Sequence, residues 1–108
     1  MNDADAQSLT VIVPAHNEEQ CLVELVTRLA TTLSPLDLVW DVLVVDDGST
    51  DATWQVTREL RKKGYPVGGI RLSRNFGKEI AMSAGIDHVD GACVIIDADL
   101  QDLSLIHI

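Results

Sequence analysis

The sequence predicts an α/β fold in which a parallel sheet carries helices on its faces. Short apolar runs rich in β-branched residues alternate with stretches of helical period, and the strand–helix–strand order occurs three times. The connections are short, and no internal repeat or low-complexity stretch interrupts them. Parallel strands are joined by such helical crossovers, and a sheet covered on both faces has strands that are apolar throughout. We therefore expect one domain of this class, truncated after about four strands.

The first strand is expected at residues 9–13, where the run LTVIV is apolar and β-branched, and Pro14 is expected to close it. Asn17 is a suitable N-cap for the next helix, because its side-chain oxygen can accept a backbone N–H of the first turn. The glutamates at 18–19 support a helix start there, since carboxylates favour the positive end of a helix dipole. Pro35 helps to end this helix. One face of it carries a stripe of apolar residues at spacings of three and four, namely Leu22, Leu25, Val26, Leu29, Ala30 and Leu33.

The second strand is expected at residues 42–45 and runs directly into Asp46 and Asp47. One of the residues 49–51 is expected to cap the helix that follows. Basic residues crowd the carboxyl end of this helix, and Gly64 is expected to stop it.

The rest of the chain continues the alternation. Residues 69–72 form a weaker third strand, and a third helix is expected at about residues 77–88. The fourth strand is expected at residues 92–96 and ends at Asp97. One face of the third helix carries Ile80, Ala81 and Ala84.

The overall composition excludes some functions. A net charge of −9 argues against a nucleic-acid partner, which needs a basic face. Residues 1–8 are polar and acidic without the apolar core of a signal peptide, so we expect a disordered segment there. Cys21 and Cys93 lie in apolar segments without metal-ligand spacing, and both are expected to be buried thiols in a reducing compartment. Since no run approaches the ~20 apolar residues of a membrane span, the chain is expected to be cytoplasmic.

Two pairs of carboxylates follow strands of the predicted sheet. Asp46 and Asp47 follow the second strand, and Asp97 and Asp99 follow the fourth. Each pair alone is also typical of turns and helix caps. In a parallel sheet, however, these strand ends share the edge where ligands bind. Carboxylates that converge there repel one another unless a cation or a hydrogen-bond donor compensates, so this edge is predicted to be functional.

The two pairs suit different ligands. Residues i and i+2 of an extended chain point to one side, so Asp97 and Asp99 can reach one hard cation. Oxygen ligands favour Mg²⁺ or Mn²⁺, and such an ion keeps sites for water and phosphate oxygens. Asp46 and Asp47 suit hydrogen bonds from a base N–H or from ribose hydroxyls. No G-x-G-x-x-G or Walker A motif is present, which argues against dinucleotide binding and P-loop phosphate transfer.

Three motifs follow one another along the chain: LTVIVPAHNE at residues 9–18, VLVVDDGS at 42–49 and VIIDADLQD at 94–102. They resemble the opening motifs of family 2 inverting glycosyltransferases, which have the GT-A fold, a Rossmann-like parallel sheet with flanking helices. The run RNFGKE at residues 74–79, followed by DADLQD at residues 97–102, makes the chain most similar to polyprenyl-phosphate hexose transferases. That group contains dolichyl-phosphate mannose synthase and bacterial undecaprenyl-phosphate glucosyltransferases.

The resemblance implies a nucleotide-sugar site that draws residues from all three motifs. Asp97 and Asp99 would form the metal-binding Asp-x-Asp motif for Mg²⁺ or Mn²⁺. Asp46 would contact the base or the ribose, with Val44 packed beside it. Tyr is common in the family where His16 stands, so this lining position departs from the pattern. The other residues expected at the site are Pro14, Glu18 and Asp47, with Ala98 and Gln101 near the diphosphate.

The implied reaction is inverting transfer of a hexose from a UDP- or GDP-hexose to a polyprenyl phosphate, in cell-envelope glycan biosynthesis. Arg74 and Lys78 would face the same site, although they would equally well offset the acidic edge. The metal takes up charge on the departing diphosphate. A lipid phosphate, with a second pKa of about 6, is largely ionised at neutral pH and needs no strong base. No catalytic residue is assigned, and the full-length protein is expected at the cytoplasmic face of the membrane.

Two alternatives stay open at this point. A receiver-type signalling domain also gathers Asp residues around Mg²⁺ and accepts a phosphoryl group. Its acidic pair follows the first strand, whereas here a strand and a helix precede Asp46. A non-catalytic nucleotide-sugar-binding module would share this half of the fold.

The last residues depart from the family pattern. The family continues after Asp102 with prolines and an acidic residue, whereas this chain reads LSLIHI at residues 103–108. We therefore expect residues 9–102 to be the nucleotide-sugar-binding half of the domain and residues 103–108 to be a non-native tail. The acceptor site and any membrane helices would then lie beyond this chain, which by itself is expected to be inactive.

Overall fold

The computed structural model describes residues 8–98, in which strands and helices alternate as predicted. Expectations for residues 1–7 and 99–108, which include Asp99, Gln101 and the tail, lie outside this range. None of the described helices combines the length and the apolarity that crossing a membrane requires. In chain order the elements are β1 (Ser8–Ala15), α1 (Glu19–Leu33), β2 (Val39–Asp46), α2 (Thr53–Lys62), β3 (Val67–Arg71), α3 (Lys78–Asp87) and β4 (Cys93–Ile95).

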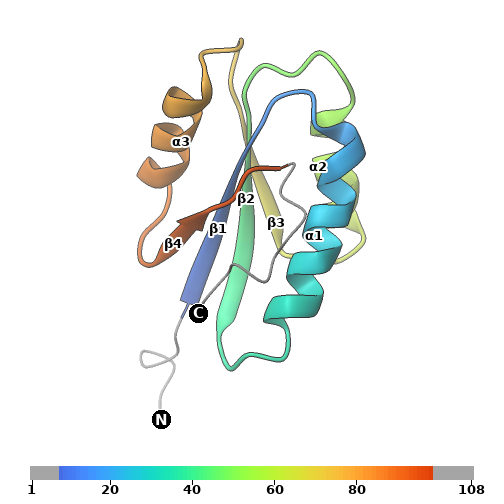
Figure 1. Cartoon of the computed structure of the whole chain (residues 1–108), viewed down its shortest axis with the longest axis vertical. Coiled ribbons are helices and arrows are strands. Elements are labelled where there is room, and N and C mark those ends of the chain that lie inside the picture. Colours follow the sequence, from blue (N-terminus) through green and yellow to red (C-terminus); the bar gives the residue numbers. More distant parts are fainter. Residues whose placement is uncertain (1–7, 99–108) are drawn as a thin grey trace.

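The strands form one four-stranded parallel sheet in the order β3-β2-β1-β4 (Figure 1). Residues 8–15 of β1 pair with residues 39–46 of β2 along the whole strand. On the other side of β1, residues 10–12 pair with residues 93–95 of β4. The chain thus adds β2 and β3 on one side of β1 and then crosses to the other side for β4. This makes the carboxyl ends of β1 and β4 the topological switch point, where open α/β sheets bind ligands.

Helices cover both faces of the sheet, with α1 and α2 on one face and α3 on the other (Figure 1). Because side chains alternate along a strand, β1 contributes to both layers. Val11 and Val13 belong to the larger core under α1 and α2, and Ile12 packs with Val45 and with Ala81 of α3. The predicted stripe of α1 is confirmed for Leu22, Leu25, Val26, Leu29 and Leu33, which are buried.

Helix α3 lies close to the sheet because small residues face the strands. Ala81 and Gly85 are buried, whereas Ile80, which was expected on the same face as Ala81, is 51% exposed. A Cβ at Gly85 would lie 2.7 Å from Cγ2 of Ile12 and 3.2 Å from Cγ2 of Val45. A larger residue at position 85 would therefore push α3 away from the sheet.

Pro14 does not close the first strand, which continues one residue beyond it. Proline has no N–H to give to the ladder, so it fits only where no such bond is needed. The backbone of Ile12 faces β4 and accepts a bond from the N–H of Ile96 at 3.0 Å. The backbone nitrogen of Pro14, two residues further on, also faces the β4 side. Among the described residues, the bond from Ile96 to Ile12 is the last one between β1 and the β4 segment, so no partner there needs an N–H from position 14. The strand therefore continues through Pro14 without losing a hydrogen bond.

The predicted helix caps hold only in part. Asn17, the expected N-cap of α1, has φ 55°, and the N-cap position belongs to Glu18. The Asn17 side chain binds the next loop instead. The prediction for α2 is closer, because the N–H of Thr53 donates to Oδ1 of Asp51 at 2.9 Å. Gly64, with φ 104°, follows the end of α2 as expected.

The prediction of two buried thiols is wrong. Cys93 is exposed and Cys21 is only half-buried. Cys93 lies in β4, which forms an edge of the described sheet and pairs only with β1. The apolar segment around Cys93 therefore did not predict its burial correctly, because the burial of a residue in an edge strand depends on what covers the free side of that strand.

Candidate functional site

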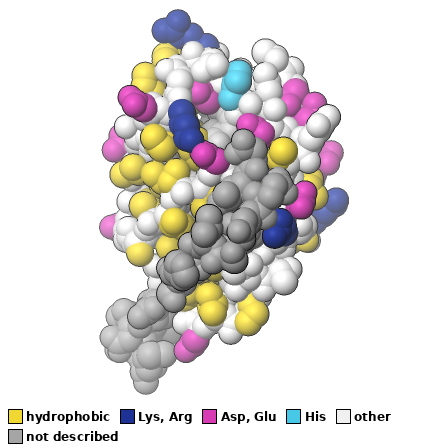
Figure 2. Space-filling model, in the orientation of Figure 1, with side chains coloured by type: hydrophobic (Ala, Val, Ile, Leu, Met, Phe, Trp, Pro, Cys, Tyr) yellow, Lys and Arg dark blue, Asp and Glu magenta, His cyan; other side chains and the backbone are white. Residues whose placement is uncertain are grey.

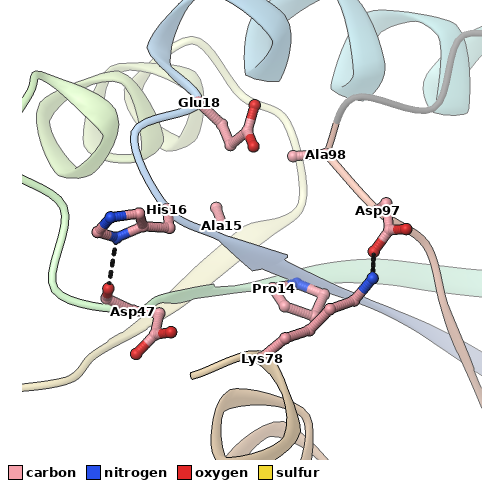
Figure 3. A pocket seen from close by; sticks show the side chains of 8 residues that line it. All are labelled: Pro14, Ala15, His16, Glu18, Asp47, Lys78, Asp97 and Ala98. Atoms are coloured by element: carbon pink, nitrogen blue, oxygen red, sulfur yellow. Dashed lines mark hydrogen bonds and ion pairs between the residues drawn. The ribbon is translucent and has the colours of Figure 1, made fainter. Parts of the chain in front are cut away.

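A pocket of about 200 Å³ lies at the carboxyl ends of the strands, at the switch point between β1 and β4 (Figure 3). Its walls come from the end of β1 and the loop after it, from the residue after β2, from the start of α3 and from the residues after β4. Sites for drug-sized ligands are commonly about 300–1,000 Å³, so the described residues enclose only part of a ligand as large as a nucleotide sugar. The lining residues are Pro14, Ala15, His16, Glu18, Asp47, Lys78, Asp97 and Ala98.

Most of the predicted site residues meet in this pocket, although some lie elsewhere. Val44 is buried in the core under α1 and α2, Asp46 lies at the end of β2 without lining the pocket, and Arg74 also lies outside it. Asp99 and Gln101 fall outside the described residues. The predicted roles of all these residues remain predictions. Ala15 lines the pocket without having been singled out from the sequence.

A basic and an acidic side chain form an ion pair across the pocket. Nζ of Lys78, the first residue of α3, contacts Oδ1 of Asp97, which follows β4 (Figure 3). The side chains are 55% and 49% exposed, so solvent screens the pair, and its contribution to stability is on the order of 0–1 kcal/mol. The arrangement shows instead that Asp97 presents a carboxylate oxygen to a cation inside the pocket.

The oxygen donors of the pocket suit a divalent cation that takes few ligands from the protein. Glu18 and Asp47 add carboxylates to the pocket in which Asp97 already contacts a cationic group. Within residues 8–98, no three His, Cys, Asp or Glu side chains are arranged to hold a metal ion by themselves. Mg²⁺ is commonly bound by one or two carboxylates together with phosphates and water, so Asp97 fits such an ion.

Asp47 holds the start of α3. Its Oδ1 accepts the N–H of Phe76 at 2.8 Å, and its Oδ2 accepts the N–H of Gly77 at 3.0 Å. A helix N-terminus leaves such amides without partners inside the helix, so Asp47 caps α3 from a neighbouring loop. Because the next residue in the chain is Lys78, this cap also fixes the backbone from which the Lys78 side chain enters the pocket.

His16 connects the loops that follow β2 and β3. Its Nδ1 lies 2.8 Å from the carbonyl oxygen of Asp47, and we assign the proton to Nδ1 because a carbonyl only accepts (Figure 3). Nε2 is then the acceptor, and the side-chain amide of Asn75 lies 3.3 Å from it as a donor. The ring is therefore held in one tautomer at the pocket.

Asn17 ties the loop after β1 to the loop after β2. Its Oδ1 accepts the N–H of Thr50 at 2.8 Å and that of Asp51 at 3.3 Å. Its own N–H donates to Oγ of Ser49 at 2.9 Å. The φ of 55° is left-handed, a conformation that Asn adopts more readily than most residues. This residue was noticed in the sequence as a cap, and its residue type is the signal for the turn that it makes.

Two side chains near the start of α2 supply acceptors to the amides at the start of α1. Oγ1 of Thr53 accepts the N–H of Glu18 at 2.9 Å, and Oδ2 of Asp51 accepts the N–H of Glu19 at 3.3 Å. Burial alone would raise the pKa of Asp51. Hydrogen bonds donated by Thr53 and by the Glu19 backbone outweigh this effect and lower that pKa below its ordinary value of 3.8.

Asp46 is fully buried beside Arg71, its register partner in β3. Oδ1 of Asp46 accepts the N–H of Ser49 at 2.9 Å, whereas Oδ2 has no hydrogen-bond partner among the described residues. Nε of Arg71 lies 4.0 Å from Oδ2, and the guanidinium lies 5.7 Å from the ring centre of Trp54. A buried acceptor without a donor is costly, so this oxygen suits a ligand N–H or hydroxyl. Sequence reasoning missed Arg71, because only the pairing of β2 with β3 brings it here.

The loops after β2 and β3 also touch through their backbones. A Cβ on Gly48, which has φ 67°, would collide with the backbone of Arg74 and Asn75. Only glycine allows this approach without strain. The guanidinium of Arg74 lies 4.6 Å from the ring centre of Phe76, a cation–π contact that engages Arg74 outside the pocket.

The surroundings of the pocket favour cations. Figure 2 shows Asp and Glu side chains around the upper part of the molecule, toward the carboxyl ends of the strands. The chain carries a net charge of −9, and Lys78 is the one Lys or Arg among the lining residues. Such a pocket repels a bare diphosphate unless an additional cation accompanies it.

The sequence has relatives of known family. It matches the family described as Glycosyl transferase family 2 over residues 10–104. An uncharacterized glycosyltransferase of Synechocystis sp. is 46% identical over 95 residues, which cover 87% of this chain and 30% of that protein. The undecaprenyl-phosphate 4-deoxy-4-formamido-L-arabinose transferase of Salmonella typhimurium is 35% identical over 101 residues, or 92% and 31% of the two chains. This chain therefore spans less than a third of the length of these relatives.

Solved structures share the fold. The mannosyltransferase of Pyrobaculum calidifontis in complex with GDP-Man and Mn²⁺ superposes with a TM-score of 0.70 at 29% identity, over 84% of this chain and 27% of that one. Residues 1–349 of TarS of S. aureus, in complex with UDP-GlcNAc, give a TM-score of 0.67 at 28% identity, over 86% and 27%. The expected GT-A architecture is thereby confirmed.

Proposed function

Because the chain belongs to glycosyl transferase family 2, we propose that it binds a nucleotide-diphosphate sugar together with a divalent cation, for transfer of the sugar to an acceptor. The observation that carries the proposal is the pocket at the switch point, in which Asp97 contacts a cationic group. The pocket lies where open α/β sheets bind ligands. Its acidic surroundings supply the reason for a cation, since they would otherwise repel a diphosphate.

Asp97 would hold the cation, together with Asp99 from outside the described residues. We take the ion to be Mg²⁺ or Mn²⁺, the ions that oxygen ligands favour. The Pyrobaculum mannosyltransferase, whose structure is in complex with GDP-Man and Mn²⁺, supports this choice. When bound, such an ion neutralises the charge that develops on the departing diphosphate.

The chain's own residues would bind and orient the donor. Oδ2 of Asp46 lacks a donor and would accept a hydrogen bond from the base or the ribose, once the ligand displaces the groups that cover it. Lys78 would donate to the diphosphate oxygens. Nε2 of His16 would accept a hydrogen bond from the donor once the ligand displaces the side-chain amide of Asn75, which lies 3.3 Å from it. In the inverting reaction, the acceptor oxygen bonds to the anomeric carbon while the bond from that carbon to the diphosphate breaks, and the diphosphate leaves with the electron pair.

We further propose that the sugar is a hexose and that the acceptor is a polyprenyl phosphate at the cytoplasmic face of a membrane. The Salmonella relative, named as an undecaprenyl-phosphate transferase, supports the acceptor, while the sugar in its name is an arabinose derivative. A phosphate with a second pKa of about 6 is largely ionised at neutral pH, so it attacks without a strong base. No described residue is assigned as a catalytic base, and the phospho-accepting signalling alternative is dropped because the chain belongs to a different family.

Calorimetric titration of the purified chain with UDP and with GDP, each with and without Mn²⁺, tests this proposal. We expect metal-dependent binding of one of the two nucleotides, because the acidic pocket needs the cation to accept a diphosphate. Asp97→Ala is expected to abolish this binding. Asp90→Ala serves as the matched control, since Asp90 is exposed in the connection before β4, at the opposite edge of the sheet. A folded chain that binds neither nucleotide under any of these conditions would contradict the proposal.

A further inference from the structure

We propose that Lys78 acts as a built-in cation that competes with the divalent ion for Asp97 and moves to the diphosphate when both ligands bind. This inference rests on the proposed function, and it adds a mechanism that makes the binding of metal and nucleotide interdependent. It assigns one side chain to two partners in turn. The structure shows the first of these pairings, between Lys78 and Asp97.

The location of Lys78 suits such an exchange. Its Nζ contacts Oδ1 of Asp97, the described carboxylate best placed to hold a metal, and both side chains line the same pocket (Figure 3). The Lys78 side chain is 55% exposed, so packing does not hold it in this pose. Movement of Nζ within the pocket therefore needs only rotations of a flexible side chain.

The backbone that carries Lys78 is, in contrast, held in place. Both carboxylate oxygens of Asp47 accept the amides of the two preceding residues, Phe76 and Gly77. Ala81 and Gly85, further along α3, are buried against the sheet. The Lys78 side chain thus starts from a fixed point at the pocket wall, so it stays within reach of the pocket after it leaves Asp97.

Electrostatics require the exchange once a metal binds. A divalent ion at the Asp97 carboxylate repels the ammonium group, so the two cations cannot share that oxygen. A diphosphate in the same pocket offers Lys78 new anionic oxygens, which are good partners for an ammonium point charge. Lys78 is then paired with Asp97 before the metal and the nucleotide bind, and with the diphosphate afterwards. Its positive charge has an anionic partner in both states.

This exchange predicts a coupling between the two ligands. A metal that binds alone has to break the Lys78–Asp97 pair and leaves Lys78 without an anionic partner. A metal that binds together with a nucleotide diphosphate also breaks this pair, but Lys78 then keeps an anionic partner, because its ammonium group pairs with the phosphate oxygens. Each ligand should therefore raise the affinity for the other by the same factor, as linkage requires.

Mn²⁺ binding to the full chain, measured by electron paramagnetic resonance with and without the nucleotide, tests the exchange. We compare wild type with Lys78→Gln, with the charge-preserving Lys78→Arg, and with the control Lys63→Gln, an exposed residue after α2. Without nucleotide, Lys78→Gln is expected to bind Mn²⁺ about three- to fivefold more tightly, as for loss of an exposed ion pair. With Mn²⁺ present, it is expected to bind UDP or GDP about tenfold more weakly, as for loss of a charged hydrogen bond. Lys78→Arg and Lys63→Gln are expected to resemble wild type in both titrations.

Three outcomes overturn the inference. An unchanged Mn²⁺ affinity in Lys78→Gln would show that Lys78 does not compete at Asp97. An unchanged nucleotide affinity would show that Lys78 does not move to the diphosphate, and no Mn²⁺ binding by any variant would remove its basis. Circular dichroism confirms that each variant is folded. If wild type binds Mn²⁺ but no nucleotide, the proposed function fails, while the titration with Mn²⁺ alone still decides the competition.

Discussion

Asp46 and Asp47 are adjacent in the sequence and follow the same strand, yet they have different surroundings. Asp46 is buried beside Arg71 and keeps one oxygen without a hydrogen-bond partner in the described part of the chain. Asp47 gives both oxygens to the amides at the start of α3. Successive residues of an extended chain point to opposite sides, so neighbouring carboxylates meet different elements. At the scale of the residue, the type of side chain predicted polar interactions but not the partners.

Asp51→Asn is expected to destabilise the fold at neutral pH and to change its acid dependence. The pKa of Asp51 is lowered in the folded state, so the ionised carboxylate stabilises the fold above the ordinary value of 3.8. This stabilisation is lost as the pH falls through the lower folded-state pKa. The difference in free energy of unfolding between wild type and Asp51→Asn should therefore be largest near pH 7 and shrink below pH 3.8.

Urea unfolding at several pH values between 7 and 3 measures this difference. Asp37→Asn, which removes an exposed carboxylate from the turn before β2, controls for the general effect of one surface charge. A difference for Asp51→Asn that stays constant down to the acid end of this range would show that Thr53 and Glu19 do not stabilise its ionised form.

At the scale of the element, the segments that follow β1, β2 and β3 hold one another through side-chain hydrogen bonds. Asn17 binds the loop after β2, Asp51 and Thr53 cap α1, and Asp47 caps α3. The amides at helix starts need acceptors, and side chains of neighbouring segments supply them. The pocket walls are therefore preorganised as a set, so a change in one loop is expected to affect the others.

Gly85→Ala is expected to destabilise the protein although alanine favours helices. The new methyl group would lie 2.7 Å from Cγ2 of Ile12, which is itself fully buried and has little room to move. Overpacking of this kind costs about 1–3 kcal/mol, against a gain of about 1 kcal/mol from helix propensity. We expect a net loss of up to about 2 kcal/mol, measured by urea unfolding.

Gly68→Ala is the matched control for this substitution. A Cβ at Gly68, in β3, meets nothing within 4 Å, so no clash is expected. If Gly85→Ala instead stabilises the protein by about the propensity gain, α3 does not lie as close to the sheet as described.

At the scale of the whole molecule, the strand order decides where the pocket lies. The chain builds β1, β2 and β3 toward one side and then places β4 on the other side of β1. The connection from β1 to β2 crosses one face through α1, and the connection from β3 to β4 crosses the other face through α3, so a crevice opens between the ends of β1 and β4. Residues far apart in the sequence, such as His16, Lys78 and Asp97, meet there as a result.

The same order predicts how stability is distributed over the sheet. Strands β1 and β2 have neighbours on both sides, whereas β3 and β4 form the edges of the described sheet. The amides of Val13 and Val44 should therefore exchange hydrogen at least about tenfold more slowly than that of Ile70 in β3, a difference of about 1.4 kcal/mol. Hydrogen exchange followed by NMR measures these rates, and equal rates across the sheet would mean that it opens as one unit.

A large part of this protein was predictable from the sequence because its local signals agree. Apolar runs of β-branched residues alternate with helical stripes, and that alternation predicted the order of elements, the parallel sheet and the edge at which the pocket lies. Acidic residues at strand ends pointed to a cation, and Asp97 does lie in the pocket at that edge. The motifs identified the family, which the comparison with known sequences confirmed.

Only the tertiary structure decided which groups are paired with one another. Four contacts at this edge join residues that lie 19 to 31 positions apart in the sequence. They are the bond from Phe76 to Asp47, the bond from His16 to Asp47, the Lys78–Asp97 pair and the Arg71–Asp46 pair. A local pattern carries the period and the burial of one element, because those depend on near neighbours. Contacts between elements depend on strand register, on the crossover of the chain and on how closely a helix packs. These are set by the balance of packing over the whole molecule, so no single segment of the sequence contains them.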